Sequence, residues 1–189
     1  MISSDKFLNL LQRGNTSYKY FYLLGCVDSI IKSKKQYDFD FLGQYMIAEA
    51  ILYGDFAADR YTKNDRLYDV VVYLYRKDDC FSALTDINTI FEKINENKDE
   101  YVCKMIHQLT LYVPYRLLAT DDINRELTGL MDWQKNSKIE KLSYEMDTIY
   151  MISGKTIIWK DDAFDFVIMN KENLKRDIIN ELNKKFNRK

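Results

Sequence analysis

The chain has 189 residues, of which 47% are hydrophobic and 30% are charged, and its formal net charge is −1. This size suits one domain with a sizeable core over residues 1–189, and the composition excludes a disordered chain. The three cysteines form neither a C-x-x-C pair nor an even set, which indicates reduced thiols. The sequence shows neither a long apolar run nor a signal-peptide pattern, so we expect a cytoplasmic protein that does not associate with a membrane.

The first part of the sequence predicts helices packed around one strongly apolar segment. A short helix is expected within residues 3–14, followed by the apolar helix over residues 15–31. Gly25 lies in this second helix, where a missing side chain would let another helix approach closely, although glycine weakens a helix by roughly 1 kcal/mol relative to alanine. The apolar spacing over residues 38–54 predicts a third helix that ends at a glycine.

The next segment, NDRLYDVVVYLYRKDD at residues 64–79, fits two structures. Its apolar residues share one helical face: Leu67, Val70, Val71 and Leu74. The run DVVVYLY is also β-branched and aromatic enough for a strand. We predict a helix that is either central or reserved for a partner. Further amphipathic helices are expected over residues 85–95 and 101–111, and Pro114 ends the second of them.

The C-terminal part of the sequence predicts a β-hairpin followed by a long helix. In DTIYMISGKTIIW, Ser153 and Gly154 separate two β-rich runs, which predicts a hairpin within residues 145–160. An aspartate then caps a helix over residues 161–189 with a continuous apolar stripe. The predicted fold class is therefore mainly α, a multi-helix bundle with its helical core in residues 1–140 and one small β-hairpin near the C-terminal third.

The residue types allow few kinds of catalytic chemistry. His107 is the only histidine, so one copy of the chain cannot build a site with two imidazoles. A nucleophilic dyad of His107 with Cys26 or Cys103 would need spatial proximity that the sequence does not reveal. A Gly-rich phosphate loop and a G-x-S-x-G elbow are both lacking. We expect no catalytic residues and no cofactor.

A carboxylate metal site is the one enzymatic alternative. Glu49, Asp55 and Asp59 can lie near one another at the end of the third predicted helix, because carboxylates four residues apart share a helical side. The Asp/Glu-x-Lys spacing of many metal-dependent nucleases does not follow them. Solvated surface acids are therefore the favoured interpretation, and we expect no metal in this chain.

Exposed basic and aromatic residues are the candidate contacts for DNA or a partner protein. They are Lys19, Tyr20, Tyr115, Arg116, Lys184, Lys185, Arg188 and Lys189. Residues 171–189 contain seven lysines and arginines against three acids, so a polyanion would be drawn to this tail first. The same side chains equally fit the solvated face of a terminal helix, or an ion pair between helices beside a buried tyrosine.

Four segments together resemble the helical region that precedes the nuclease module in a group of bacterial HNH-endonuclease-domain proteins. They are NTSYKYFYLLGCVDSI, FLGQYMIAEAILY, YVPYRLL and IYMISGKTIIW, in the same order. None is a catalytic motif. The sequence ends at NKKFNRK without the nuclease module, so the resemblance implies a stand-alone relative, a segment cut before the nuclease, or a subunit whose catalytic partner is another chain.

The resemblance implies a role in bacterial defence or DNA processing, without cleavage by this chain alone. We predict a non-catalytic recognition or adaptor module of a bacterial nuclease or antiphage defence system, which binds DNA or a partner protein such as a nuclease subunit. One alternative is an interaction-only subunit or a homodimer with the DVVVYLY helix at the interface. The other is the carboxylate-metal enzyme around Glu49, Asp55 and Asp59.

Overall fold

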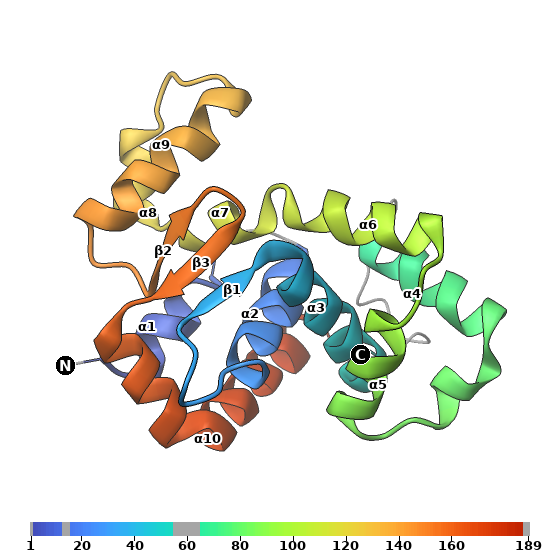
Figure 1. Ribbon diagram of the computed structural model, residues 1–189. Coiled ribbons are helices and arrows are strands. Elements are labelled where there is room, and N and C mark those ends of the chain that lie inside the picture. The colour runs from blue at the N-terminus through green and yellow to red at the C-terminus, as the bar shows by residue number, and fades with distance from the viewer. Residues whose placement is uncertain (1, 13–15, 55–64, 187–189) are drawn as a thin grey trace.

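The computed structural model describes residues 2–12, 16–54 and 65–186 and is built mainly of helices with one small sheet (Figure 1), which confirms the predicted class. The first helices are α1 (Ser4–Asn9), α2 (Tyr18–Asp28), α3 (Phe39–Tyr53), α4 (Arg66–Lys77), α5 (Ile87–Asn95) and α6 (Glu100–Thr110). A 3₁₀ turn (Asp79–Ala83) lies between α4 and α5. The remaining helices are α7 (Val113–Leu118), α8 (Asp121–Glu126), α9 (Asp132–Glu145) and α10 (Asp161–Phe186).

The pair α2 and α3 forms the centre of the core. Nearly every residue of α2 from Tyr20 onward is buried, so the helix is surrounded by other elements. Gly25 permits the close approach that the sequence predicts, because a Cβ built there would lie 3.0 Å from the backbone nitrogen of Met46 and from the Cβ of Tyr45. Gly43 of α3 does the same toward α6, where a Cβ would lie 2.7 Å from Cγ2 of Thr110.

The predicted boundaries of α2 are too wide. Asn15, whose side chain suits the cap of the helix predicted over residues 15–31, lies outside the described residues, and the helix begins only at Tyr18. Ser17 precedes it without a side-chain capping bond. The helix ends at Asp28 because the chain turns there toward the sheet, and the Ser29 hydroxyl donates to the Cys26 carbonyl at 3.2 Å. The end of the first predicted helix, near residue 14, likewise lies outside the described residues.

The ambiguous segment is a helix, as predicted. Its apolar face, formed by Leu67, Val70, Val71 and Leu74, is completely buried in the core of the same chain. The face that the sequence could reserve for a partner is therefore already covered. Asn64, the first residue of the segment and of a type that suits a helix cap, lies outside the described residues. Asp65 caps the helix instead, with Oδ1 accepting from the backbone N–H groups of Leu67 at 2.9 Å and Tyr68 at 3.2 Å.

We expect Asp65→Ala to lower the free energy of unfolding by about 1 kcal/mol, because two N–H groups at the start of α4 lose their acceptor. Asp65→Asn keeps an acceptor oxygen at the same place and should cost less. Urea unfolding of the two variants measures the difference. Equal losses for alanine and asparagine would show that this cap does not stabilise the helix.

The sheet has one strand more than the predicted hairpin. Strands β2 (Tyr150–Ser153) and β3 (Thr156–Trp159) form the hairpin, with Gly154 in the turn at a φ of 58°. The additional strand β1 (Gln36–Asp38) pairs antiparallel with β3, which gives the order β1-β3-β2. The sequence pattern between the second and third predicted helices does not indicate this strand. The backbone of β3 supplies the hydrogen-bond partners that stabilise so short a strand.

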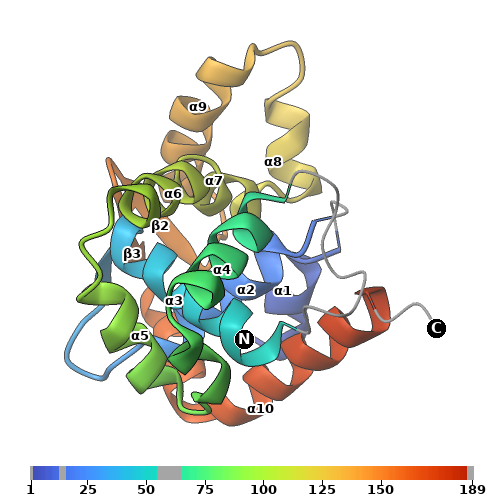
Figure 2. The same cartoon turned by 90° about the vertical axis from the view of Figure 1, so that its right-hand side faces the viewer.

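The C-terminal part of the chain contains a protruding arm and the long last helix. Helices α8 and α9, which sequence patterning does not reveal, form the arm, and α9 projects from the body in both views (Figures 1 and 2). Helix α10 has the predicted apolar stripe. It packs along α2, on the side of the body opposite the arm. Its backbone leaves helical geometry at one residue, Asn170, where φ is −123° and ψ is 16°.

Candidate recognition cleft

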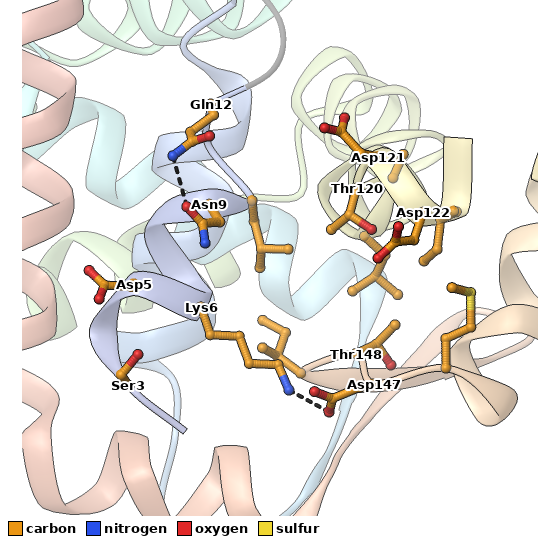
Figure 3. A pocket seen from close by; sticks show the side chains of 16 residues that line it. Ser3, Asp5, Lys6, Asn9, Gln12, Thr120, Asp121, Asp122, Asp147 and Thr148 are labelled. Atoms are coloured by element: carbon orange, nitrogen blue, oxygen red, sulfur yellow. Dashed lines mark hydrogen bonds and ion pairs between the residues drawn. The ribbon is translucent and has the colours of Figure 1, made fainter. Parts of the chain in front are cut away.

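A cleft of about 620 Å³ lies where the arm meets the body (Figure 3). Helix α1 forms one wall, the start of α8 forms the opposite wall, and the connection from α9 to β2 closes one end. This volume falls within the range of ligand sites in proteins, roughly 300–1,000 Å³. Three segments that are distant in the sequence thus build a single concave surface.

The floor of the cleft is apolar and belongs to the core. Four of its side chains are almost completely buried: Leu10, Leu118, Ile123 and Ile149. The connection that follows α9 is held in place by hydrogen bonds. The Thr148 hydroxyl lies 2.8 Å from the Tyr150 carbonyl oxygen and 3.0 Å from that of Ser143. The Lys160 ammonium donates to the Met146 carbonyl at 2.5 Å. The cleft therefore has a fixed shape on this side.

The rim of the cleft is acidic. Among the lining residues Asp5, Asp121, Asp122 and Asp147 are aspartates, and the only lysine is Lys6. In Figure 3 the Lys6 side chain extends from α1 toward Asp147, while Asp121 and Asp122 lie on the α8 wall. Asp5 points to the other side of α1. The aspartates give the cleft a net negative field, which attracts cations and repels phosphate.

Lys6 and Asp147 form the ion pair that connects two walls of the cleft. Their Nζ and Oδ1 atoms are 2.5 Å apart, and the hydrogen bond from Lys6 lowers the pKa of the Asp147 carboxyl. The Asp147 side chain is still 84% exposed, so a second cation can reach it. On the α8 wall, Asp122 pairs with Arg125 one turn later. Such exposed pairs contribute little to stability and exchange readily.

The N-terminal residues predicted as recognition contacts mostly serve the chain's own packing. Tyr20 is 3% exposed, and its hydroxyl lies 3.4 Å from the Leu11 carbonyl oxygen. The expectation that this tyrosine is exposed is wrong, because the chain at Leu11, just after α1, and Phe186 of α10 pack against it. The ammonium group of Lys19, on the same helix, lies 3.4 Å from the Leu10 carbonyl oxygen.

The predicted basic tail is only partly described by the structure. Lys184 forms an ion pair with Glu181 at 2.5 Å. The Lys185 ammonium lies 5.8 Å from the centre of the Tyr20 ring. Arg188 and Lys189 lie outside the described residues. The two described lysines thus face partners within the chain, and binding of DNA by the tail stays a prediction.

The two candidate residues of the VPYRLL segment differ in their exposure to solvent. Tyr115 is buried, with its hydroxyl 3.3 Å from the Gly154 carbonyl oxygen, so its expected exposure is also wrong. Arg116 is exposed and lies over the Tyr112 ring at 5.0 Å. A small cavity of about 140 Å³ is lined by Tyr115, His107 and their neighbours. His107 Nδ1 lies there 3.8 Å from Asp40 Oδ1.

The position of Cys26 disfavours the dyad of Cys26 with His107. Cys26 is completely buried, and burial raises the pKa of its thiol. Cys103 is exposed, and its sulfur lies 3.9 Å from the Asn97 carbonyl oxygen. A nucleophilic cysteine needs a lowered thiol pKa and access to substrate, and Cys26 has neither.

Of the three acids that the sequence groups as a possible metal site, only Glu49 lies in the part of the chain that the structure describes. Asp55 and Asp59 lie outside the described residues. Glu49 is completely buried beside Asp28 of α2, and Lys175 of α10 lies 2.7 Å from the Asp28 carboxylate. Within residues 2–12, 16–54 and 65–186, no three His, Cys, Asp or Glu side chains are grouped so that they could hold a metal ion. A lysine ammonium beside this carboxyl pair also disfavours a metal cation there.

Comparison with known proteins adds no further identification. No family model, curated protein or solved structure matches this chain. In the part of the chain that the structure describes, none of the helices combines the length and apolar character needed to cross a bilayer.

Proposed function

We propose that this chain is a non-catalytic recognition module that binds a partner protein, in line with its resemblance to the helical region of bacterial nuclease and defence proteins. The cleft beside α1 is the observation that carries this proposal. Its apolar floor suits the aliphatic part of a lysine or arginine side chain, and its aspartates suit the charged end. The proposed ligand is therefore a basic, extended segment of a partner protein.

The charge of the cleft favours a protein partner over DNA. Phosphate groups would meet Asp121, Asp122 and Asp147, and like charges brought together at an interface oppose binding. The described lysines of the tail already face Glu181 and aromatic rings within the chain. A polyanion would have to displace these contacts before it gained new ones.

The projecting arm offers the partner a second surface. Trp133 at the start of α9 is 73% exposed, and Met131 just before it is 66% exposed. Tryptophan is enriched among the residues that dominate the energy of protein interfaces. Since α8 and its neighbouring connection also line the cleft, a partner bound in the cleft reaches the arm directly.

A short fluorescent peptide of alternating lysine and leucine tests this function by fluorescence anisotropy. We expect saturable binding that weakens with added salt. A triple variant, Asp121→Asn, Asp122→Asn and Asp147→Asn, should bind about ten-fold more weakly, because the loss of three partly exposed charge contacts totals about 1.4 kcal/mol.

The matched control neutralises three exposed acids outside the cleft with Asp69→Asn, Asp165→Asn and Glu172→Gln. It changes the net charge by the same amount and should leave peptide binding nearly unchanged. Equal weakening of peptide binding by both triple variants would show that the net charge alone is responsible, which would contradict a site in the cleft.

A further inference from the structure

Helix α10 consists of two segments joined at Asn170. The residues on either side are helical, whereas Asn170 itself is not, and its side-chain amide donates to the Phe166 carbonyl at 2.9 Å. That bond satisfies a carbonyl at the end of the first segment, in the manner of a helix cap. Residues 171–186 therefore start as a second helical unit, directly after a position where the backbone already departs from helical angles.

The second segment begins with two lysines that reach the end of α2. The ammonium group of Lys171, the first residue after the break, donates to the Asp28 carbonyl at 2.7 Å and lies 3.4 Å from its carboxylate. Lys175, one turn later, lies 2.7 Å from the other carboxylate oxygen. The Asp28 side chain is only 4% exposed. Cations at the C-terminus of a helix also interact favourably with its dipole.

Glu49 places a second carboxyl group at the same junction. Burial, reinforced by the neighbouring Asp28, raises the pKa of Glu49 well above its usual range. Burial lowers the pKa of Lys175, but Asp28 more than compensates and the pKa is raised overall.

The surroundings of Glu49 contain further ionisable groups. Tyr45 and Tyr53 of α3 interact electrostatically with the carboxyl pair, Glu172 of α10 acts on Tyr53, and Glu92 of α5 acts on Tyr45. Burial raises the pKa of both phenols. Both phenols therefore stay uncharged up to at least their usual pKa of about 10. Glu49 faces the charged group of Asp28 on α2 and those of Lys171 and Lys175 on α10.

We propose that Asn170 is a hinge and that Asp28, Glu49 and Lys175 form a latch, which holds residues 171–186 against α2 and α3. Ionisation of Glu49 places two negative charges side by side in a buried site and weakens the latch. The second segment then opens more often while the rest of the core stays folded. Opening uncovers Leu174, Ile178 and Leu182, which are fully buried, and separates Phe186 from Tyr20.

The direction of the pH effect follows from the proton on Glu49. The folded chain binds this proton more tightly than the unfolded chain. The stabilisation of the folded chain by this proton is therefore fully present below the pKa that Glu49 has in the unfolded chain. It is lost as the pH rises toward the folded pKa. Ionisation of Glu49 at rising pH therefore weakens the latch. A change of one pKa unit corresponds to a ten-fold change in the opening equilibrium.

Amide hydrogen exchange followed by mass spectrometry at about pH 6 and about pH 9 tests this inference. After correction for intrinsic exchange, we expect protection in residues 171–186 to fall at least ten-fold at the higher pH, with little change in the middle of α3. Glu49→Gln should remove the pH response, because glutamine has a similar shape and does not ionise. A pH response that survives Glu49→Gln would overturn the assignment.

Two lysine variants separate the latch from general fraying of α10. Lys175→Met should lower protection of residues 171–186 already at the lower pH. Lys184→Met breaks the exposed pair with Glu181 on the same helix and should leave protection unchanged. If Lys175→Met loosens α2 and α3 as much as α10, the segment does not open separately and the hinge is wrong.

Discussion

Asp28→Ala is expected to lower the free energy of unfolding by about 3 kcal/mol. The change leaves Lys175 without the carboxylate at 2.7 Å and removes the second contact of Lys171. Breaking a buried ion pair by removing one partner costs roughly 3–5 kcal/mol. The low end applies because the Lys175 side chain is still 13% exposed and can partly reach water. Urea unfolding of the variant and the unmodified chain measures the loss.

A second substitution in the same cluster distinguishes charge from packing. In Asp28→Ala with Lys175→Met, the unpaired ammonium is gone, so the double variant should be more stable than Asp28→Ala alone. Glu181→Gln breaks only the exposed pair with Lys184 and should shift stability by less than about 1 kcal/mol. A double variant less stable than Asp28→Ala would show that the pair does not account for the loss.

Gly25→Leu is expected to lower the free energy of unfolding by about 3 kcal/mol or more, because α2 and α3 have no room for a side chain between them. Even a Cβ would lie 3.0 Å from the Met46 backbone nitrogen, which cannot rotate away. Overpacking a core costs roughly 1–3 kcal/mol and sometimes more. Thermal unfolding monitored by circular dichroism measures the effect.

Gly25→Ala provides the graded comparison. Alanine gains about 1 kcal/mol in helix propensity over glycine, while its Cβ still meets Met46 and Tyr45. We therefore expect a net loss smaller than that of Gly25→Leu. If alanine stabilises the chain, the helices have room to adjust, and the close approach of α2 and α3 does not require a glycine.

Local sequence patterns predicted the helices that have strong apolar faces. Helix α3 ends at Gly54, as the glycine after the apolar run predicts, and α4 is a helix despite its β-branched residues. In α4 the spacing of Leu67, Val70 and Leu74 outweighed β propensity, because all three side chains reach the core on one side.

The elements that the sequence did not reveal depend on contacts between distant segments. Strand β1 has only three residues, and its hydrogen-bond partner β3 lies far along the chain. Helix α9 buries few apolar side chains, Ile139 and Leu142 among them, so its apolar pattern is weak. Its position depends instead on packing against β2 and α7.

The cleft and the buried cluster were missed for the same reason. Asp121 and Asp122 lie in a helix that the sequence pattern does not reveal, and nothing nearby in the sequence connects them with Lys6 or Asp147. The carboxyl group beside Glu49 comes from Asp28 of α2, which no spacing within the segment of Glu49 indicates. Sequence spacing predicts neighbours on one helix, but not which helices will pack together.

Direct comparison of peptide and DNA binding tests the proposed function most sharply. Labelled lysine–leucine peptide, duplex DNA and single-stranded DNA would be titrated with the chain at low and at physiological salt. A variant with Lys184, Lys185, Arg188 and Lys189 neutralised would be titrated in parallel. Our account predicts binding of the peptide by both proteins and negligible binding of DNA. Tight, salt-sensitive binding of DNA that is lost in the neutralised variant, with no binding of the peptide, would contradict it.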